Sequence, residues 1–231
     1  MKIPLSNRLM ACCDFIHPGD RVADIGCDHG YLSIYLLKNN IASSVIASDI
    51  NEGPLHSAVR NSEKYGVRDK IAFYLSDGVR NIPRDFDALV CAGMGGDTMV
   101  SILSAAPWLQ SEHYRLILQC QSKTPMLRQY LSKTGWHIAK ETVLKDGKFL
   151  YTVMEVIWKP GHTLTPGQCY FPPALQVAPT KDLSAYYLWV VRGLELIVSN
   201  QKEQADPFKV QALEELSKLP LEFNWLKEDA P

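Results

Sequence analysis

The sequence predicts an α/β protein: a mostly parallel sheet with helices on both faces, an antiparallel hairpin at the end of the sheet, and a small helical hairpin after it. Two observations predict the sheet. Short apolar runs alternate with amphipathic runs between residues 21 and 133, and the apolar runs end in glycines or acids. Such alternation is typical of crossover units with parallel strands. The third observation is Lys145-Asp-Gly-Lys148 between two β-rich runs, which predicts the hairpin.

Elements of the first half follow from this alternation. Apolar residues at helical spacing predict a leading helix over 8–16 that ends before Pro18-Gly19. Three strands, each followed by a polar or glycine-containing turn, come next. The predicted strands span 21–25, 44–49 and 70–78, and the predicted helices span 31–40 and 54–65.

The second half continues the pattern and then breaks it. A fourth strand over 87–96 closes on glycines, and a fifth ends in polar residues. Two β-rich runs without a helix between them then predict the antiparallel hairpin. The predicted strands are 87–96, 116–120, 137–144 and 149–158, and the predicted helices are 98–105 and 125–133, the latter with proline in its first turn and glycine past its end.

A change in composition at Lys159-Pro160-Gly161 predicts a boundary between a catalytic domain, 1–160, and an extension, 161–231. Several prolines predict that about 20 residues after the boundary are linker-like and largely extended. Helices are then predicted over 182–200 and 207–219, paired as a helical hairpin. Tyr186 and Val190 are expected in its core, although the Tyr186, Tyr187 and Trp189 group has the chemistry to stack on RNA.

Length, composition and charge limit the function classes. With 231 residues, 46% hydrophobic and 21% charged, the chain has material for one good core and an appendage. Its net charge of -1 gives no global sign of nucleic-acid binding, so any RNA contact must use local basic patches. The six cysteines include no C-x-x-C pair, so we expect no disulfide framework, no metal site and a reducing cytoplasm. We also expect no secretory leader and no membrane span.

The turn after the first strand is the main candidate site. Gly26 and Gly30 allow backbone N–H groups to approach a ligand, and the helix that follows has an electropositive start. The same turn carries Asp24, Asp28 and His29, and two carboxylates would repel a phosphate. The turn therefore favours a ligand with hydroxyls, an amine or a positive charge.

Polar or glycine motifs follow all five strands, at the sheet edge where parallel α/β sheets bind ligands. Asp49 follows Asp24 by 25 residues, close to the ~20 expected of an acid that accepts hydrogen bonds from ribose hydroxyls. Together the motifs predict an adenosine-type cofactor. The acidic turn disfavours a dinucleotide and favours the ammonium and sulfonium of S-adenosylmethionine. The other motifs are Asp77-Gly78, Ala92-Gly93-Met94-Gly95-Gly96 and Gln119-Cys120-Gln121-Ser122.

The segments D-I-G-x-D-H-x-Y-L at 24–32 and A-G-M-G-G at 92–96 resemble those of the class I methyltransferases. Within that superfamily the chain is similar to the bacterial TrmK-like enzymes, which methylate N1 of adenine 22 in tRNA, and Leu5-Ser-Asn-Arg-Leu9 matches their start. The resemblance covers roughly residues 1–160. It implies a Rossmann-like fold, S-adenosylmethionine as cofactor and tRNA as partner. We also expect a cytoplasmic location, no metal, and a monomer or weak dimer.

The resemblance also implies roles for individual residues. Asp49 would hold the ribose, and Ala92 and Gly93 would lie beside the cofactor. The methionine moiety would lie against Asp24, Gly26, His29 and Gly30. Ile50 and Asn51 would flank the ribose, Asp77 and Gly78 would face the adenine edge, and Arg8, Arg60, Met94 and Gly95 would contact the substrate.

Asp28 is our candidate catalytic residue. The fourth strand ends in Ala92-Gly93-Met94-Gly95 instead of the N-P-P-Y type of motif found in many enzymes that methylate amino groups of bases. Adenine N1 has a free lone pair at neutral pH, so no proton has to leave before attack. Placement and fixed dipoles could supply most of the acceleration. A carboxylate near N6 would stabilise the positive charge that develops on methylation. We assign this role to Asp28 because we expect it to point from the turn toward the side where the substrate enters.

Other interpretations remain open at this stage. Asp24 and Asp49 could be ordinary strand-end caps, His29 a structural hydrogen-bond donor, and Met94 a space-filling side chain. Whole-protein alternatives are a small-molecule methyltransferase with an apolar pocket over Met94, a non-catalytic RNA-binding protein of the same fold, and a disfavoured dehydrogenase. The terminal helices could bind tRNA or form a dimer. The basic residues Arg8, Arg60, Lys64, Arg68 and Lys70 could form an RNA-binding rim or a solvated surface.

Overall fold

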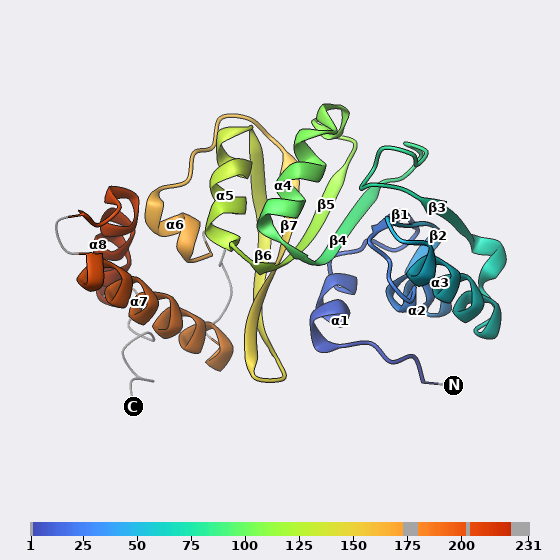
Figure 1. The fold of residues 1–231 in the computed structure, drawn as a ribbon, viewed down its shortest axis with the longest axis horizontal. Coiled ribbons are helices and arrows are strands. Elements are labelled where there is room, and N and C mark those ends of the chain that lie inside the picture. Colours follow the sequence, from blue (N-terminus) through green and yellow to red (C-terminus); the bar gives the residue numbers. More distant parts are fainter. Residues whose placement is uncertain (1, 173–179, 202–203, 223–231) are drawn as a thin grey trace.

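The computed structural model describes residues 2–172, 180–201 and 204–222, and it is built on one seven-stranded sheet in the order β3-β2-β1-β4-β5-β7-β6 (Figure 1). The first five strands are parallel, and β7 is antiparallel to both β5 and β6. The predicted fold class is confirmed. The strands are β1 (Asp20–Ile25), β2 (Ala42–Asp49), β3 (Ile71–Leu75), β4 (Ala88–Gly95), β5 (Arg115–Ser122), β6 (Trp136–Asp146) and β7 (Phe149–Trp158).

Helices cover both faces of the sheet, as the continuous apolar runs of the central strands require. Neighbouring strand residues point to opposite faces: Val90 packs with α1, α2 and α3, whereas Leu89 packs with α4 and α5. The helices are α1 (Asn7–Cys13), α2 (Tyr31–Lys38), α3 (Glu52–Lys64), α4 (Gly96–Ser104), α5 (Thr124–Lys133), α6 (Pro166–Tyr170), α7 (Lys181–Gln201) and α8 (Pro207–Glu222), with short 3-10 turns at Arg68–Lys70 and Pro107–Leu109.

Strand order reverses direction between β1 and β4, which are adjacent in the sheet. The chain leaves β1 toward β2 on one side and leaves β4 toward β5 on the other. The two connecting loops therefore diverge above the carboxyl ends of these strands and leave a crevice, the usual ligand position in such sheets.

The prediction of an extended linker after residue 160 is wrong for Pro166–Tyr170, because these residues form α6. The Thr165 side chain accepts from the Gln168 N–H, and the Gln168 side chain accepts from the Thr165 N–H. This capping box, with proline in the first turn, starts a helix in a proline-rich segment. Pro173 and Pro179 lie outside the described residues.

The terminal helices pack on each other and on the hairpin. Tyr186 and Val190 are buried, as predicted, and Tyr187 donates from its hydroxyl to the Leu216 carbonyl. Their apolar cluster includes Val143 of β6, so the extension shares a core with the sheet. Figure 1 shows α7 and α8 side by side beyond α6.

A buried ion pair also ties the extension to the sheet. Arg128 of α5 and Glu141 of β6 are completely buried and paired, and Arg128 Nη1 donates to the Cys169 carbonyl of α6 at 3.1 Å. Removing one partner of such a pair leaves an uncompensated buried charge, so the contact is sensitive to single substitutions.

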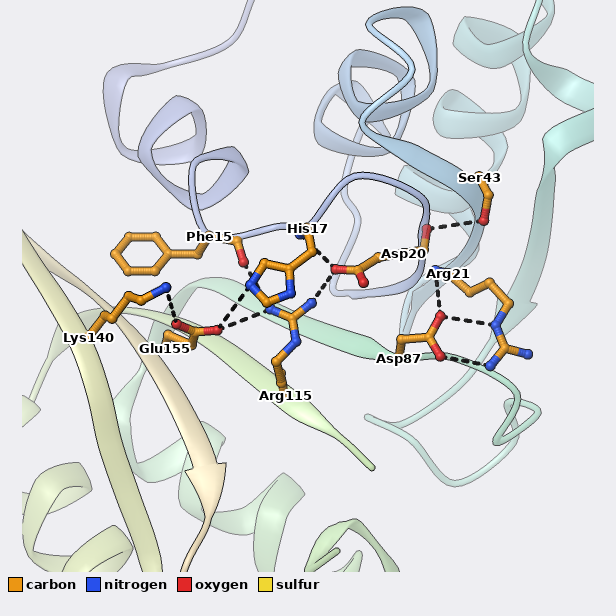
Figure 2. Close-up of polar contacts among 9 residues, drawn as sticks. All are labelled: Phe15, His17, Asp20, Arg21, Ser43, Asp87, Arg115, Lys140 and Glu155. Atoms are coloured by element: carbon orange, nitrogen blue, oxygen red, sulfur yellow. Dashed lines mark hydrogen bonds and ion pairs between the residues drawn. The ribbon is translucent and has the colours of Figure 1, made fainter. Parts of the chain in front are cut away.

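A second ionic cluster lies at the amino ends of β1 and β5 (Figure 2). Arg115 donates to Glu155 at 3.1 Å and also pairs with Asp20, while Lys140 Nζ lies 3.4 Å from Glu155. Arg21 and Asp87 form a neighbouring pair; hydrogen bonds from Arg21 lower the pKa of Asp87 to about 2. These contacts lie at the edge of the sheet opposite to the crevice and hold the strands together there.

Candidate cofactor and active site

A pocket of about 270 Å³ occupies the crevice at the carboxyl ends of β1 and β4. Its walls come from α1, from the turn between β1 and α2, and from the end of β4. The structure thus brings together eight of the residues predicted for the site, with others that sequence reasoning did not select. The lining residues are Arg8, Leu9, Asp24, Gly26, Cys27, Asp28, His29, Tyr31, Leu32, Ala92, Gly93 and Met94.

The turn between β1 and α2 is held in a left-handed backbone conformation at Gly26, Asp28 and Gly30, with φ of 71°, 50° and 71°. Gly26 N–H donates to the Ser48 carbonyl at 2.8 Å, which fastens the turn to β2. A Cβ on Gly26 would overlap the Met94 methyl group, and one on Gly30 would lie 2.9 Å from the Ala58 Cβ. Gly30 is therefore required by backbone geometry and by space, whereas Gly26 is required by its left-handed backbone, since the Met94 methyl group ends a flexible side chain.

Asp24 lies at the inner end of the pocket and is 4% exposed. Its Oδ2 accepts from the Ser33 hydroxyl at 2.6 Å. Burial raises its pKa to about 6, although the hydrogen bonds from Ser33 act in the opposite direction. The site therefore holds a carboxylate whose ionised form is poorly solvated and lacks a cationic partner among the described residues.

Asp49 ends β2 and accepts two backbone hydrogen bonds. Asp28 N–H donates to Oδ2 at 3.1 Å, and Asn51 N–H donates to Oδ1 at 2.9 Å. The interpretation of Asp49 as a cap that accepts backbone hydrogen bonds at the end of a strand is therefore correct. A carboxylate has further acceptor sites on each oxygen, so the same group can also accept from hydroxyls.

Asp28 and His29 lie at the outer part of the pocket, with side chains 70% and 54% exposed. His29 Nε2 is 3.7 Å from Asp28 Oδ1. The role of the His29 ring as a hydrogen-bond donor within the turn stays a prediction. The His29 carbonyl accepts from Asn61 Nδ2 at 2.9 Å and links the turn to α3. Asp28 is accessible to a substrate from solvent.

The loop at the end of β4 is positioned by Gln119 of β5, which is fully buried. Gln119 Oε1 accepts from Gly93 N–H at 3.0 Å and from Arg8 Nη1 at 3.2 Å. Arg8 Nε lies 3.6 Å from Asp146 Oδ2 at the hairpin turn. Sequence reasoning placed Gln119 only at the polar end of the fifth strand. A polar residue inside the apolar run Leu116–Cys120 was the available signal for a positioning role.

Eight predicted residues lie outside the lining of this pocket: Asp49, described above, and seven others. Gly30 packs beneath the turn, and Gly95 lies beside Asp97 and Ser122. Asp77 pairs with Arg80 at 3.2 Å, and Gly78 packs on Ile102. Arg60 bonds to Ser57 on the exposed side of α3, so the structure does not place it at the pocket. The remaining two, Ile50 and Asn51, are exposed between β2 and α3.

Two properties of the described residues bear on function class. Among residues 2–172, 180–201 and 204–222, no three His, Cys, Asp or Glu side chains group as they would around a metal ion. No helix within these ranges has the length and apolar character to cross a membrane.

Comparisons with known proteins agree with this geometry. Residues 5–154 match the family described as methyltransferase domain. The tRNA (adenine(22)-N(1))-methyltransferase of Bacillus subtilis is 36% identical over 154 residues, which are 66% of this chain and 65% of that protein. The chain thus aligns with slightly less than two thirds of that relative's length.

Solved structures extend the likeness to the whole fold. The Bacillus subtilis m1A22 tRNA methyltransferase TrmK superposes with a TM-score of 0.77 at 29% identity, covering 98% of this chain and 99% of that one. Streptococcus pneumoniae Sp1610, solved in complex with S-adenosyl-L-methionine, gives a TM-score of 0.80 at 28% identity, covering 92% and 99%. With the family match over residues 5–154, the sheet order and the pocket between β1 and β4, this chain belongs to the methyltransferase domain family.

Proposed function

We propose that this protein is an S-adenosylmethionine-dependent tRNA methyltransferase that modifies N1 of an adenine, adenine 22 by likeness to the Bacillus subtilis relative. The observation that carries the proposal is the glycine turn at the strand reversal, which combines exposed backbone with carboxylates in one pocket. A phosphate-rich dinucleotide fits this turn poorly, whereas a ligand with an amine and a sulfonium fits its charge.

The residues of the pocket fit S-adenosylmethionine, which when bound supplies an electrophilic methyl group. Because Gly26 has no Cβ, the Met94 methyl group packs directly against the glycine turn that would receive the cofactor. Asp24 offers a buried carboxylate to a cationic amine, whose positive charge would favour the ionised form. Asp49 keeps acceptor capacity for ribose hydroxyls while its backbone hydrogen bonds hold the turn.

The chemistry proposed for the chain's own residues is positioning and charge stabilisation. Adenine N1 attacks with its lone pair, so no side chain has to remove a proton first. A positive charge then spreads over the ring toward N6, and the accessible carboxylate of Asp28 would stabilise it there. Gln119 and Arg8 would hold the β4 loop against the base. N1 is occupied in duplex pairing, so the target adenine must be unpaired or flipped out.

The wider setting follows from the substrate. A tRNA substrate implies a cytoplasmic location.

The test is transfer of a labelled methyl group from S-adenosylmethionine to unmodified bacterial tRNA, followed by nucleoside analysis. We expect label in 1-methyladenosine, lost when adenine 22 is replaced by guanine and lost in Asp24→Ala. Cofactor binding without any label on RNA would contradict the proposal. It would favour the small-molecule alternative, because the fold and cofactor would remain without the RNA substrate.

A further inference from the structure

A second concave site, of about 280 Å³, lies between the end of β5, strand β7 and helix α7. We propose that this groove binds an unpaired nucleobase next to the target adenine in the RNA substrate, so the inference rests on the proposed function. The groove is assembled by the C-terminal extension, and its walls differ in chemistry. One wall carries Gln121, Ser122 and Lys123, and the opposite wall is formed by the face of α7.

The polar wall is shared with the proposed active site. Ser122 pairs with Gly95 of β4, and Gln121 Nε2 lies 3.6 Å from the position that a Cβ on Gly93 would take. The segment that ends β5 therefore has the β4 loop on one side and the groove on the other. An RNA strand that presents one base at the β4 loop would have its neighbouring nucleotide within reach of the groove.

The α7 wall offers an aromatic platform. Trp189 is 65% exposed, and its ring centroid lies 5.7 Å from that of Tyr186, which is 4% exposed. The buried Tyr186 ring packs against one side of the Trp189 indole, and the rest of the indole surface is exposed to solvent. A large exposed indole is the kind of surface on which bases stack without regard to sequence. The amide of Gln121 adds a hydrogen-bond partner for a base edge, whereas the Lys123 ammonium is paired with Asp97 Oδ2 at 2.9 Å.

Gly193, one turn after Trp189, widens the groove. Glycine in a helix interior is unfavourable compared with other residues, and α7 has 21 residues with Gly193 well inside it. No described atom lies within 4 Å of a Cβ added at this position. The absence of a side chain here is thus not required by packing among the described residues, and it leaves space that a flat base would fill. Aliphatic side chains, among them Leu150, Leu194 and Ile197, also line the groove. Together with the indole and the polar β5 wall, they suit the flat apolar faces and the polar edge of a nucleobase.

The test uses Trp189→Ala and Gly193→Leu, with Leu196→Ala as the matched control. Leu196 is on the same helix, is 63% exposed and lies outside this groove. We expect Trp189→Ala and Gly193→Leu to raise the KM for tRNA roughly 5- to 100-fold, the range expected for loss of one base stack. The KM for S-adenosylmethionine should not change, and Leu196→Ala should behave as wild type. Gly193→Leu should melt no lower than wild type, because leucine favours the helix.

A binding measurement separates this inference from the proposed function. RNA carrying 2-aminopurine beside the target adenine should lose fluorescence on binding to wild type and to Leu196→Ala, but not to Trp189→Ala. Wild-type KM values in both groove variants would overturn the inference while tRNA methylation stands. If wild type methylates no tRNA, the proposed function fails and the fluorescence decides alone: quenching that depends on Trp189 supports the groove, and equal or absent quenching overturns it.

Discussion

Replacing Asp24 with asparagine should make the protein without cofactor more stable. Asp24 is 4% exposed, and burial raises its pKa from 3.8 to about 6. At about 1.4 kcal/mol per pKa unit, ionisation of this carboxylate costs the folded state on the order of 3 kcal/mol. Asparagine has nearly the same shape, and its side-chain oxygen can still accept from the Ser33 hydroxyl.

The sign of the pH dependence follows from the same values. The pKa of Asp24 is higher in the folded state than in the unfolded state, so the unfolded chain loses its proton first as pH rises. The wild type therefore loses stability relative to Asp24→Asn between about pH 4 and pH 6, and the difference is constant above that range. We expect the variant to be about 3 kcal/mol more stable at pH 8 and roughly half as much at pH 5.

Urea unfolding at these two pH values, without cofactor, checks the magnitude. Exposed Asp69→Asn is the control and should change stability little at either pH. The reasoning is refuted if Asp24→Asn is no more stable than wild type at pH 8, or if its advantage does not shrink at pH 5. The rise in Tm caused by S-adenosylmethionine should be smaller in Asp24→Asn. An unchanged rise would assign Asp24 to the structure of the turn alone.

Three other predictions use the same structure. Asp28→Asn should lower kcat roughly 10- to 100-fold with little change in cofactor affinity, because asparagine tolerates the left-handed backbone at this position; equal losses in both would assign the residue to the cofactor site. Arg128→Met should destabilise the protein by about 3–5 kcal/mol in urea unfolding, whereas adding Glu141→Leu should recover much of the loss; no recovery would mean that the pair is not the cause. Gln119→Leu should lower kcat for methyl transfer more than thermal stability, since it removes the acceptor that joins Gly93 and Arg8; unchanged kcat would show that the β4 loop needs no such support.

Local patterns were sufficient for the order of the elements. The predicted strands and helices of residues 20–158 agree with the structure to within a few residues, because alternation of apolar runs and glycine turns is a short-range signal. The capping box of α6 was also a local signal, but the surrounding prolines pointed to a linker. Burial of Tyr186 and Val190 followed from helical spacing, whereas the exposure of Trp189 depended on how α7 packs.

The sequence by itself determined the parallel sheet, the hairpin and the acidic glycine turn at Asp24–Gly30, since each depends on residues close together in the chain. Only the tertiary structure decided which distant side chains join that turn. Arg8 donates a hydrogen bond to Gln119, 111 positions away in the chain, and pairs with Asp146 at the hairpin. Arg60, in contrast, does not line the pocket. Such contacts depend on strand order and helix packing, which the spacing of residues along the chain does not encode.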